Sequence, residues 1–311
     1  MVVISYNMER ELPRTLFTLL PPYQLGLENL IVEVVVVDNG SKKPPRFDEP
    51  LGNVRFLQVA SPTHSPVPAV NLGLAEARGD FIGVMIDGAR LASPGMLHYA
   101  LLASQLHERP IVSTLGFHLG PDVQMRSTEN GYCQEEEDQL LSTVDWRKNG
   151  YELFNISVFA GSSSLGWFKP LFESNALFMP RVLWEELGGF DERFAAPGGG
   201  LVNLDTYARA CELPDTELIT LLGEGSFHQV HGGIATNQKR PDANWASFHE
   251  EYVRIRGKDF TVPKKTPIFL GTLPPQVLPH VSFSAQKGDF QMKTGKKKFG
   301  DLILRGLLRN K

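Results

Sequence analysis

The stretch that decides the fold runs Phe81-Ile-Gly-Val-Met-Ile-Asp87-Gly-Ala-Arg90-Leu-Ala-Ser-Pro94. Its first six residues are almost all apolar and predict a buried strand, and a carboxylate and a turn follow. A second stretch upstream, Val34-Val-Val-Val-Asp38-Asn-Gly-Ser41, has the same form. Burying an acid at the end of an apolar strand costs free energy unless the carboxylate has a partner or a ligand to bind. Open α/β sheets bind their ligands where the strands end. The two stretches therefore predict a sheet whose carboxyl edge holds Asp38 and Asp87.

Strand and helix patterns alternate around these two stretches. The segments predicted as strands are Val2–Ser5, Ile31–Val37, Val54–Val59, Phe81–Ile86, Ser174–Met179 and Leu218–Gly223. Helical spacing is found at Glu9–Leu20, Ala69–Arg78, Pro94–His107, Arg181–Leu187 and Asn203–Glu212. The rhythm is lost between residues 120 and 170, where 135–138 is an acidic run expected on a solvated helix surface. This alternation predicts an α/β fold with a Rossmann-like, mostly parallel sheet flanked by helices.

Composition narrows the class of protein. The chain has 311 residues, 42% of them hydrophobic and 21% charged, and a net charge of −4, so no basic field indicates a nucleic-acid partner. Cys133 and Cys211 have no metal or disulfide spacing and predict free thiols in a reducing compartment. No run approaches the roughly 18 apolar residues of a membrane span. We therefore predict a soluble, cytoplasmic enzyme.

Two histidines lie close together late in the chain, in Phe227-His228-Gln-Val-His231-Gly-Gly233. Glycines around them indicate a loop in which side chains converge on a ligand, which makes His231 the first and His228 the second candidate metal ligand. The competing interpretation is a pair of core histidines. For Asp38, the competing interpretation is an Asx-turn that bonds only its own backbone.

Five motifs occur in an order that resembles a known family. They are Val3-Ile-Ser5-Tyr6-Asn7, Val36-Val-Asp-Asn-Gly-Ser41, Asn71-Leu-Gly-Leu-Ala-Glu-Ala-Arg-Gly-Asp80, Ile86-Asp87 with Pro94, and Gly188-Gly-Phe-Asp-Glu-Arg-Phe194. Together they resemble the inverting family 2 glycosyltransferases of the GT-A fold, over about residues 2–233. The resemblance implies a nucleotide-diphosphate-sugar donor, with UDP favoured. It also implies a hydroxyl acceptor on a cell-surface polysaccharide or lipid-linked glycan.

The resemblance also assigns donor-binding residues. It puts Asp38 near the nucleotide base, beside Ser5, Tyr6 and Asn7. Asn71 would approach the nucleotide from a helix start, where a plain N-cap is the alternative.

The family's cation-binding acids are incomplete here. Asp87 aligns with the first acid, but the second falls on Ala89 and a further common acid on Arg90. One hypothesis keeps a divalent cation, with Mn²⁺ favoured over Mg²⁺, on Asp87 and a histidine of the 228–231 segment. The other lets Arg90 face the diphosphate without a metal, at about 4 kcal/mol of Coulomb energy for a 4 Å pair. We favour a retained, weakened metal site.

The general base is predicted from the same resemblance. The family's acids ahead of the helix that ends in Arg209 fall on Val202 and Asn203, which leaves Asp205 as first candidate. Asp191 is the second. The segment Ala195–Gly200 is predicted to be a mobile hinge beside the pocket.

The domain prediction divides the chain at residue 235. Residues 1–235 are expected to form the glycosyltransferase domain, with a donor half to about residue 120 and an acceptor half from residue 121. Residues 236–311 are expected to form an irregular C-terminal extension. The tail Lys296–Lys311 reads as a basic amphipathic helix that could bring the enzyme to the inner face of an anionic membrane, or dock on the protein itself.

Two rival functions are a catalytically impaired module that binds nucleotide-sugar or glycan, and a nucleotidyltransferase, which the glycine-free Asn7–Glu11 argues against. The oligomeric state is not predicted.

Overall fold

The computed structural model describes residues 1–28, 30–45, 52–232 and 241–292. The strands in this part are β1 Val2–Ser5, β2 Val34–Asp38, β3 Val54–Gln58, β4 Phe81–Met85, β5 Arg90–Ala92, β6 Pro110–Leu119, β7 Ser157–Phe159, β8 Leu177–Pro180, β9 Glu217–His228 and β10 Ile268–Gly271. The α-helices are α1 Glu11–Leu19, α2 Val67–Glu76, α3 Met96–Ser104, α4 Gln124–Glu129, α5 Gln134–Ser142, α6 Arg181–Leu187, α7 Val202–Glu212, α8 Pro241–Arg256 and α9 Leu278–Met292.

The strands form one mixed sheet, in the order β10-β9-β6-β8-β4-β1-β2-β3, with β5 on β9 and β7 on β6. Neighbours β3, β2, β1 and β4 run parallel, as do β6, β9 and β10, whereas β8 runs antiparallel between β4 and β6. The carboxyl ends of β1, β2, β4, β6 and β9 therefore meet at one edge, and β8 begins there. The predicted fold class, α/β with a mostly parallel sheet flanked by helices, is confirmed.

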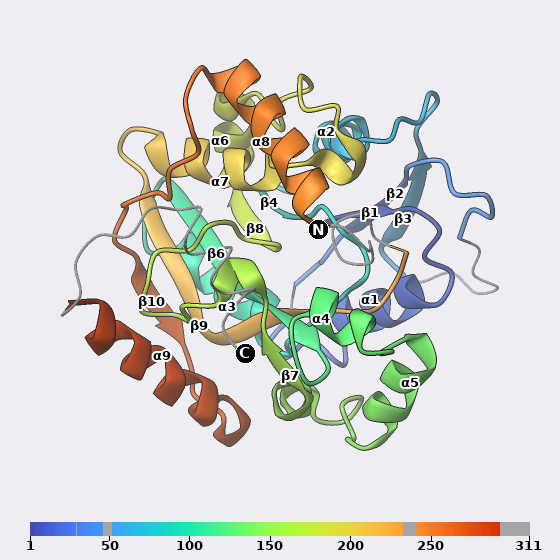
Figure 1. Ribbon diagram of the computed structural model, residues 1–311, viewed down its shortest axis with the longest axis vertical. Coiled ribbons are helices and arrows are strands. Elements are labelled where there is room, and N and C mark those ends of the chain that lie inside the picture. Colours follow the sequence, from blue (N-terminus) through green and yellow to red (C-terminus); the bar gives the residue numbers. More distant parts are fainter. Residues whose placement is uncertain (29, 46–51, 233–240, 293–311) are drawn as a thin grey trace.

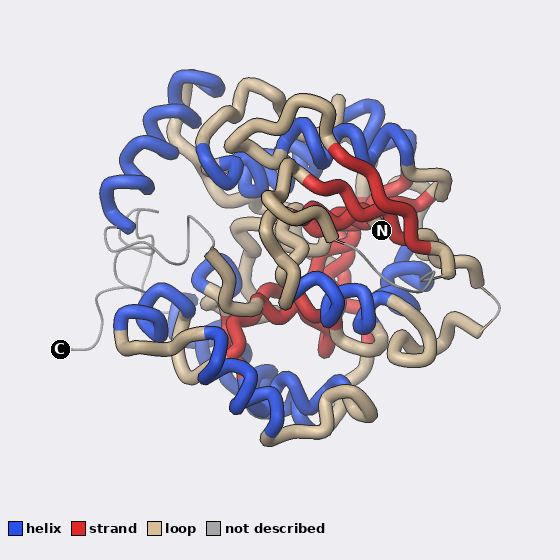
Figure 2. Tube along the Cα trace, turned by 90° about the vertical axis from the view of Figure 1, so that its right-hand side faces the viewer, coloured by secondary structure: helices blue, strands red, loops and turns tan. Residues whose placement is uncertain are grey.

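Each face of the sheet is covered by helices, because side chains alternate along the strands. Val3, Val34 and Val36 pack with α1 and α3 in one core, and Val2, Val35 and Val37 with α2, α6 and α7 in the other. In Figure 1, α2, α6, α7 and α8 gather above the sheet, and in Figure 2 the strands run between helical layers. The continuous valine run of β2 is apolar on both faces for this reason.

The C-terminal extension is more regular than its sequence pattern predicts. Its strand β10 pairs in parallel with β9 over residues 268–271, so it belongs to the same sheet as the first 235 residues. The helix α9 follows. No helix in the described part of the chain is long and apolar enough to cross a membrane. The predicted amphipathic tail, Lys296–Lys311, lies outside the described residues.

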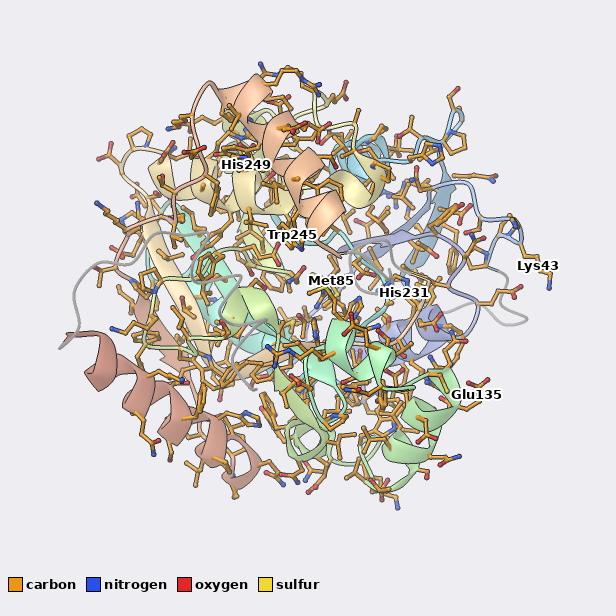
Figure 3. All side chains as sticks on the ribbon, viewed as in Figure 1. Lys43, Met85, Glu135, His231, Trp245 and His249 are labelled. Atoms are coloured by element: carbon orange, nitrogen blue, oxygen red, sulfur yellow. The ribbon has the colours of Figure 1, made fainter. Side chains whose placement is uncertain are left out.

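Between residues 120 and 170, the sequence pattern missed several elements. The chain forms α4 and β7 there, and the helix expected at 135–138 is α5; the strand before this region, β6, was not predicted. The acidic run 135–138 lies on α5 and is exposed at Glu135, which Figure 3 labels, but Glu137 is fully buried. The prediction of a purely solvated surface is wrong at Glu137, because Arg10 and a backbone amide bind its carboxylate.

Candidate functional site

Asp87 follows β4 by two residues and is held by its own turn. The Ala89 amide donates to Asp87 Oδ1 at 3.0 Å, which leaves Oδ2 directed away from the turn. Gly88 donates from its backbone to Ile4 O at 2.8 Å, and a Cβ at Gly88 would lie 2.4 Å from that oxygen. Only glycine lets the chain pass so close to the end of β1. The local sequence Asp-Gly therefore fixes where the carboxylate points.

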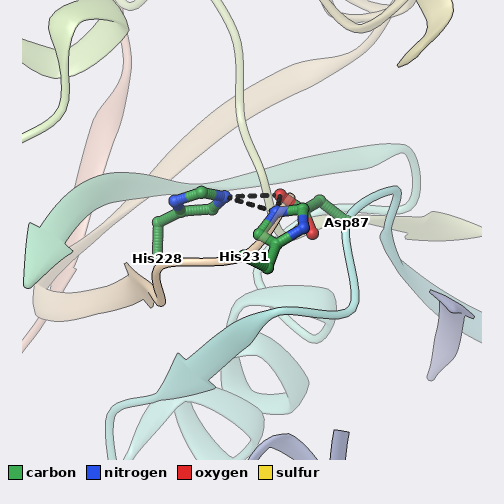
Figure 4. A group of neighbouring side chains, drawn as sticks. All are labelled: Asp87, His228 and His231. Atoms are coloured by element: carbon green, nitrogen blue, oxygen red, sulfur yellow. Dashed lines mark hydrogen bonds and ion pairs between the residues drawn. The ribbon is translucent and has the colours of Figure 1, made fainter. Parts of the chain in front are cut away.

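Two histidines from the end of β9 meet this carboxylate (Figure 4). His228 Nε2 lies 2.7 Å and His231 Nε2 lies 3.4 Å from Asp87 Oδ2. The two Nε2 atoms are 3.2 Å apart. The structure thus brings together three residues that the sequence predicted as metal ligands, from segments about 140 residues apart.

These three atoms have the spacing of ligands that share a cation. Nitrogen and oxygen ligands about 2.1 Å from an ion stand roughly 3.0–3.4 Å from one another at tetrahedral or octahedral angles. The distances between Asp87 Oδ2 and the two Nε2 atoms lie close to this range. The donor set fits a borderline divalent cation, since it combines imidazole and carboxylate.

The surroundings of His228 prepare its Nε2 as a ligand. Its Nδ1 makes a short hydrogen bond to the Gln124 side-chain oxygen, and a proton on Nδ1 would leave the Nε2 lone pair for a cation in place of the present Asp87 contact. Burial lowers the pKa of His228 to about 4 and keeps the ring neutral. Gln124 in turn donates from its backbone to His118 Nδ1 at 2.8 Å. Gln124, which sequence reasoning missed, therefore sets the tautomer of a candidate ligand.

Asp87 and His231 each stabilise the charged form of the other. Burial opposes ionisation of Asp87, but the nearby His231 and His228 outweigh it and hold the pKa of Asp87 well below its usual range. Asp87 in turn raises the pKa of His231, against the effect of burial. The site keeps an ionised carboxylate at its centre.

Arg90 lies beside this group with unused hydrogen-bonding capacity. It sits directly opposite His228 in the β5–β9 pair, is 7% exposed, and its Nη2 is 3.9 Å from Asp87 Oδ2. Among the described residues, nothing accepts a hydrogen bond from its Nε or Nη1. Burial lowers the pKa of Arg90, although Asp87 and Glu173 oppose that shift. A buried guanidinium with two unpaired nitrogens is a place where an anion would be stabilised.

Helix α5 holds the segment that carries His228 and His231 through a hydrogen bond to its backbone. Glu137 accepts a hydrogen bond from the Val230 amide at 2.7 Å and another from Arg10 at 3.0 Å. Burial raises the pKa of Glu137 to about 7. The buried carboxylate thus fixes the backbone next to His231, and no sequence signal separated it from its exposed neighbours.

The predicted donor-binding residues lie at the same edge, with their own partners. Asp38 is buried, and its carboxylate accepts from the Ser41 amide at 3.0 Å and from the Ser41 hydroxyl. Asn7 has a positive φ of 52° and accepts from the Lys42 amide at 2.9 Å. Ser5 is buried and Tyr6 half-exposed. The turn contacts of the Asx-turn interpretation are present at Asp38, and its role toward a nucleotide stays a prediction.

Asn71 does not begin a helix, in contrast to the expectation. It lies in the middle of α2, and its side chain exchanges two hydrogen bonds of 2.9 Å with the Phe190 backbone. This contact ties α2 to the Gly188–Phe194 motif. Both ends of the amide are therefore engaged within the protein.

The two predicted bases are enclosed by arginines. Asp205 is 1% exposed and accepts from Arg256 on both oxygens and from Arg209 on one, all at 2.6–2.8 Å. Asp191 pairs with Arg193 and with the same Arg256, at 2.6 and 2.8 Å. These hydrogen bonds and charges hold the pKa of Asp191 well below its usual range.

The predicted hinge is attached to α8. The amides of Ala195 and Ala196 both donate to Glu251 at 3.0 Å. Ser65 donates to the Phe194 carbonyl at 2.7 Å, just before this segment. These contacts anchor the start of the 195–200 segment, and its motion stays a prediction.

No protein-family model matches the chain, and no curated protein matches it by sequence. Solved structures resemble it. S. aureus TarS 1–349 in complex with UDP-GlcNAc is 14% identical with a TM-score of 0.47, over 98% of this chain and 78% of that one. Mannosyltransferase PcManGT from Pyrobaculum calidifontis, in complex with GDP-Man and Mn²⁺, is 16% identical with a TM-score of 0.44, over 98% of this chain and 78% of that one. GalNAc-T7 with UDP, GalNAc and Mn²⁺ is 15% identical with a TM-score of 0.47, over 80% and 47%. Against the longer TarS structure, the chain spans 40% of that chain's length.

Proposed function

We propose that this chain is a glycosyltransferase of the GT-A type, which moves a sugar from a nucleotide-diphosphate donor to an acceptor hydroxyl. The observation that carries the proposal is the convergence of Asp87, His228 and His231 with Arg90, whose Nε and Nη1 have no hydrogen-bond acceptor among the described residues. This group lies at the carboxyl edge of a Rossmann-like sheet, where nucleotides bind in such folds. A cation site next to a buried arginine with two unsatisfied nitrogens calls for a ligand with several negative charges, and a diphosphate is such a ligand.

Asp87, His228 and His231 would hold the divalent cation. When bound, the cation neutralises negative charge on the departing diphosphate. Two imidazoles favour Mn²⁺ over Mg²⁺, because Mg²⁺ prefers oxygen ligands and retains its waters. Arg90 donates hydrogen bonds to the same diphosphate from Nε and Nη1. A cation held by Asp87, His228 and His231 would thus supply charge neutralisation on the same diphosphate to which Arg90 would donate hydrogen bonds.

The donor nucleotide, the stereochemistry and the acceptor are proposed from the resemblance of the five sequence motifs to the family 2 glycosyltransferases. UDP is the favoured donor nucleotide, with Asp38 and the turn Ser5–Asn7 close to the base. Transfer proceeds with inversion, onto a hydroxyl of a cell-surface polysaccharide or lipid-linked glycan. The basic tail would hold the enzyme near an anionic membrane that carries such an acceptor.

The test is hydrolysis of UDP-, GDP- and TDP-sugars with Mn²⁺ and with EDTA. We expect turnover of at least one donor, loss of turnover with EDTA, and loss in the variant His231→Ala. His249→Ala is the matched control, because His249 also pairs with an aspartate, Asp259, at 3.0 Å on an exposed part of α8 (Figure 3). Full turnover in EDTA would mean that Arg90 stabilises the diphosphate without a cation, and it would contradict the proposed metal site.

A second candidate function is a module that binds the nucleotide-sugar without transferring it. The enclosure of Asp205 and Asp191 by arginines favours it, because neither carboxylate is free to take a proton. Binding of UDP without hydrolysis of any donor would support this alternative.

A further inference from the structure

An inverting transfer needs a carboxylate that can accept a proton from the incoming hydroxyl, and neither predicted base offers one. The Asp205 and Asp191 carboxylates each accept hydrogen bonds from two arginines. A guanidinium stabilises the ionised form and makes the carboxylate a poor proton acceptor. The base is therefore expected to be a carboxylate at the carboxyl edge of the sheet that forms no ion pair with an arginine.

Glu173 meets this requirement. It lies just ahead of β8, which runs antiparallel to β4 with Leu177 opposite Val84. Because of that direction, the residues before β8 and the residues after β4 lie at the same edge, so Glu173 approaches the level of Asp87. The segment is fixed to β6, since the Thr114 amide donates to Ser174 Oγ at 2.9 Å. Glu173 is partly exposed, so the residue is accessible from solvent.

Two asparagine amides orient the Glu173 carboxylate. Asn203 Nδ2 donates to Oε2 at 2.8 Å and Asn175 Nδ2 donates to Oε1 at 3.2 Å. A carboxylate has about four lone-pair positions, so each oxygen keeps one for a further donor. Within the described part of the chain, Glu173 forms no ion pair. Neutral amides thus position the group without the direct arginine hydrogen bonds that Asp205 accepts, although Arg90 lies near enough to interact with its charge.

Glu173 is also close to the group that would face the diphosphate. A Cβ built on Gly116 would lie 3.3 Å from Asn175 Nδ2 and 3.8 Å from Arg90 Nη1, so the two nitrogens flank the same glycine. Asn175 is the residue that holds Glu173. Asn175 therefore places the Glu173 carboxylate in the same part of the sheet as the Arg90 guanidinium.

We propose that Glu173 is the general base of the transfer, positioned by Asn203 and Asn175; this rests on the proposed glycosyltransferase function. The acceptor oxygen bonds to the anomeric carbon of the donor while the bond from that carbon to the diphosphate oxygen breaks. The hydroxyl proton passes to a free lone pair of Glu173 and then to water. The nucleoside diphosphate leaves toward Arg90 with the electron pair of the broken bond.

The experiment compares Glu173→Gln with Glu152→Gln. Glu152, in the 3₁₀ helix η1 Gly150–Ile156, is also partly buried and accepts from two asparagine amides, at 3.2 and 2.6 Å. UDP affinity with Mn²⁺ is measured by calorimetry, and turnover is measured with the donor that the wild type hydrolyses fastest. We expect Glu173→Gln to keep UDP affinity and to lose turnover by a factor of about 10²–10⁴. Glu152→Gln should change neither.

A second variant separates proton transfer from structure. Azide has no proton to lose, so it needs no base when it bonds to the anomeric carbon. We expect azide to raise turnover of Glu173→Ala by about tenfold or more, with a glycosyl azide as product, and to leave Glu152→Gln unaffected. A structural defect would not be repaired by azide.

The outcomes separate the two proposals. If the wild type binds no UDP, the glycosyltransferase proposal fails and the base assignment with it. If the wild type turns over and Glu173→Gln matches Glu152→Gln, only the base assignment fails. It also fails if Glu173→Gln loses UDP binding, which would assign Glu173 to the fold, or if the wild type binds UDP and hydrolyses no donor.

Discussion

Replacing Arg90 by methionine should stabilise the free protein and weaken nucleotide binding. Taking an ion out of water costs several kcal/mol, and each unsatisfied buried donor costs about 1–3 kcal/mol. Against this stands the attraction to Asp87 at 3.9 Å, roughly 4 kcal/mol at an effective dielectric constant of 20. Burial also lowers the pKa of Arg90 in spite of Asp87 and Glu173, in agreement with a net cost of the buried charge.

The expected gain for Arg90→Met is at least about 1 kcal/mol, which raises the melting temperature of a chain of 311 residues by about 1.5 °C or more. Bound UDP loses two charged hydrogen bonds, about 3 kcal/mol together, so its Kd rises about 100-fold. The melting temperature is measured in EDTA and the UDP affinity by calorimetry with Mn²⁺. Arg78→Met, at a guanidinium 77% exposed on the opposite edge of the sheet, is the control. A variant that melts earlier and binds UDP as well as the wild type would refute the reasoning.

Two further predictions concern the support of the site and a buried acid. Gln124→Leu removes the acceptor of the His228 Nδ1 proton, so Mn²⁺ affinity should fall about 10–100-fold in calorimetry; an unchanged affinity would contradict the tautomer assigned here. Burial raises the pKa of Glu224 from 4.5 to about 7, beside the hydroxyls of Ser93 and Tyr151. The folded protein therefore holds this proton longer than the unfolded chain, and stability present below pH 4.5 is lost as the pH rises through about 7, by roughly 3 kcal/mol. Denaturant unfolding of Glu224→Gln should show a flatter pH profile than the wild type, and parallel profiles would count against it.

Much of the fold could be read from local patterns. The valine run of β2 and the apolar run of β4 predict buried strands because strands covered on both faces leave no polar position. The helices α6 and α7 were predicted to within one residue of their bounds. The strand β6 was missed, because its apolar run is interrupted by Ser113, Thr114 and Gly116, which bond or pack against other strands.

The site was predicted in part for a similar reason. Asp87 and the two histidines are visible because an acid or a glycine-flanked histidine pair is unusual next to a strand. Asp205 was predicted as a base from the family resemblance around Arg209. Its ion pair with Arg256, 51 residues away on α8, could not be foreseen, because no local pattern reports such a contact. Glu173 was not singled out, because a glutamate before a strand looks ordinary until Asn203 is seen beside it.

The sequence by itself determined the α/β class, the carboxyl-edge position of Asp38 and Asp87, and the residue types available for a cation. Those properties depend on periodicity and on which residue follows a strand, so they are local. Only the tertiary structure decided which groups meet: the pairing of β5 with β9 sets Arg90 opposite His228, and the reversed direction of β8 brings Glu173 to the edge where Asp87 lies. Distances between segments follow from strand order and direction, which no single segment encodes.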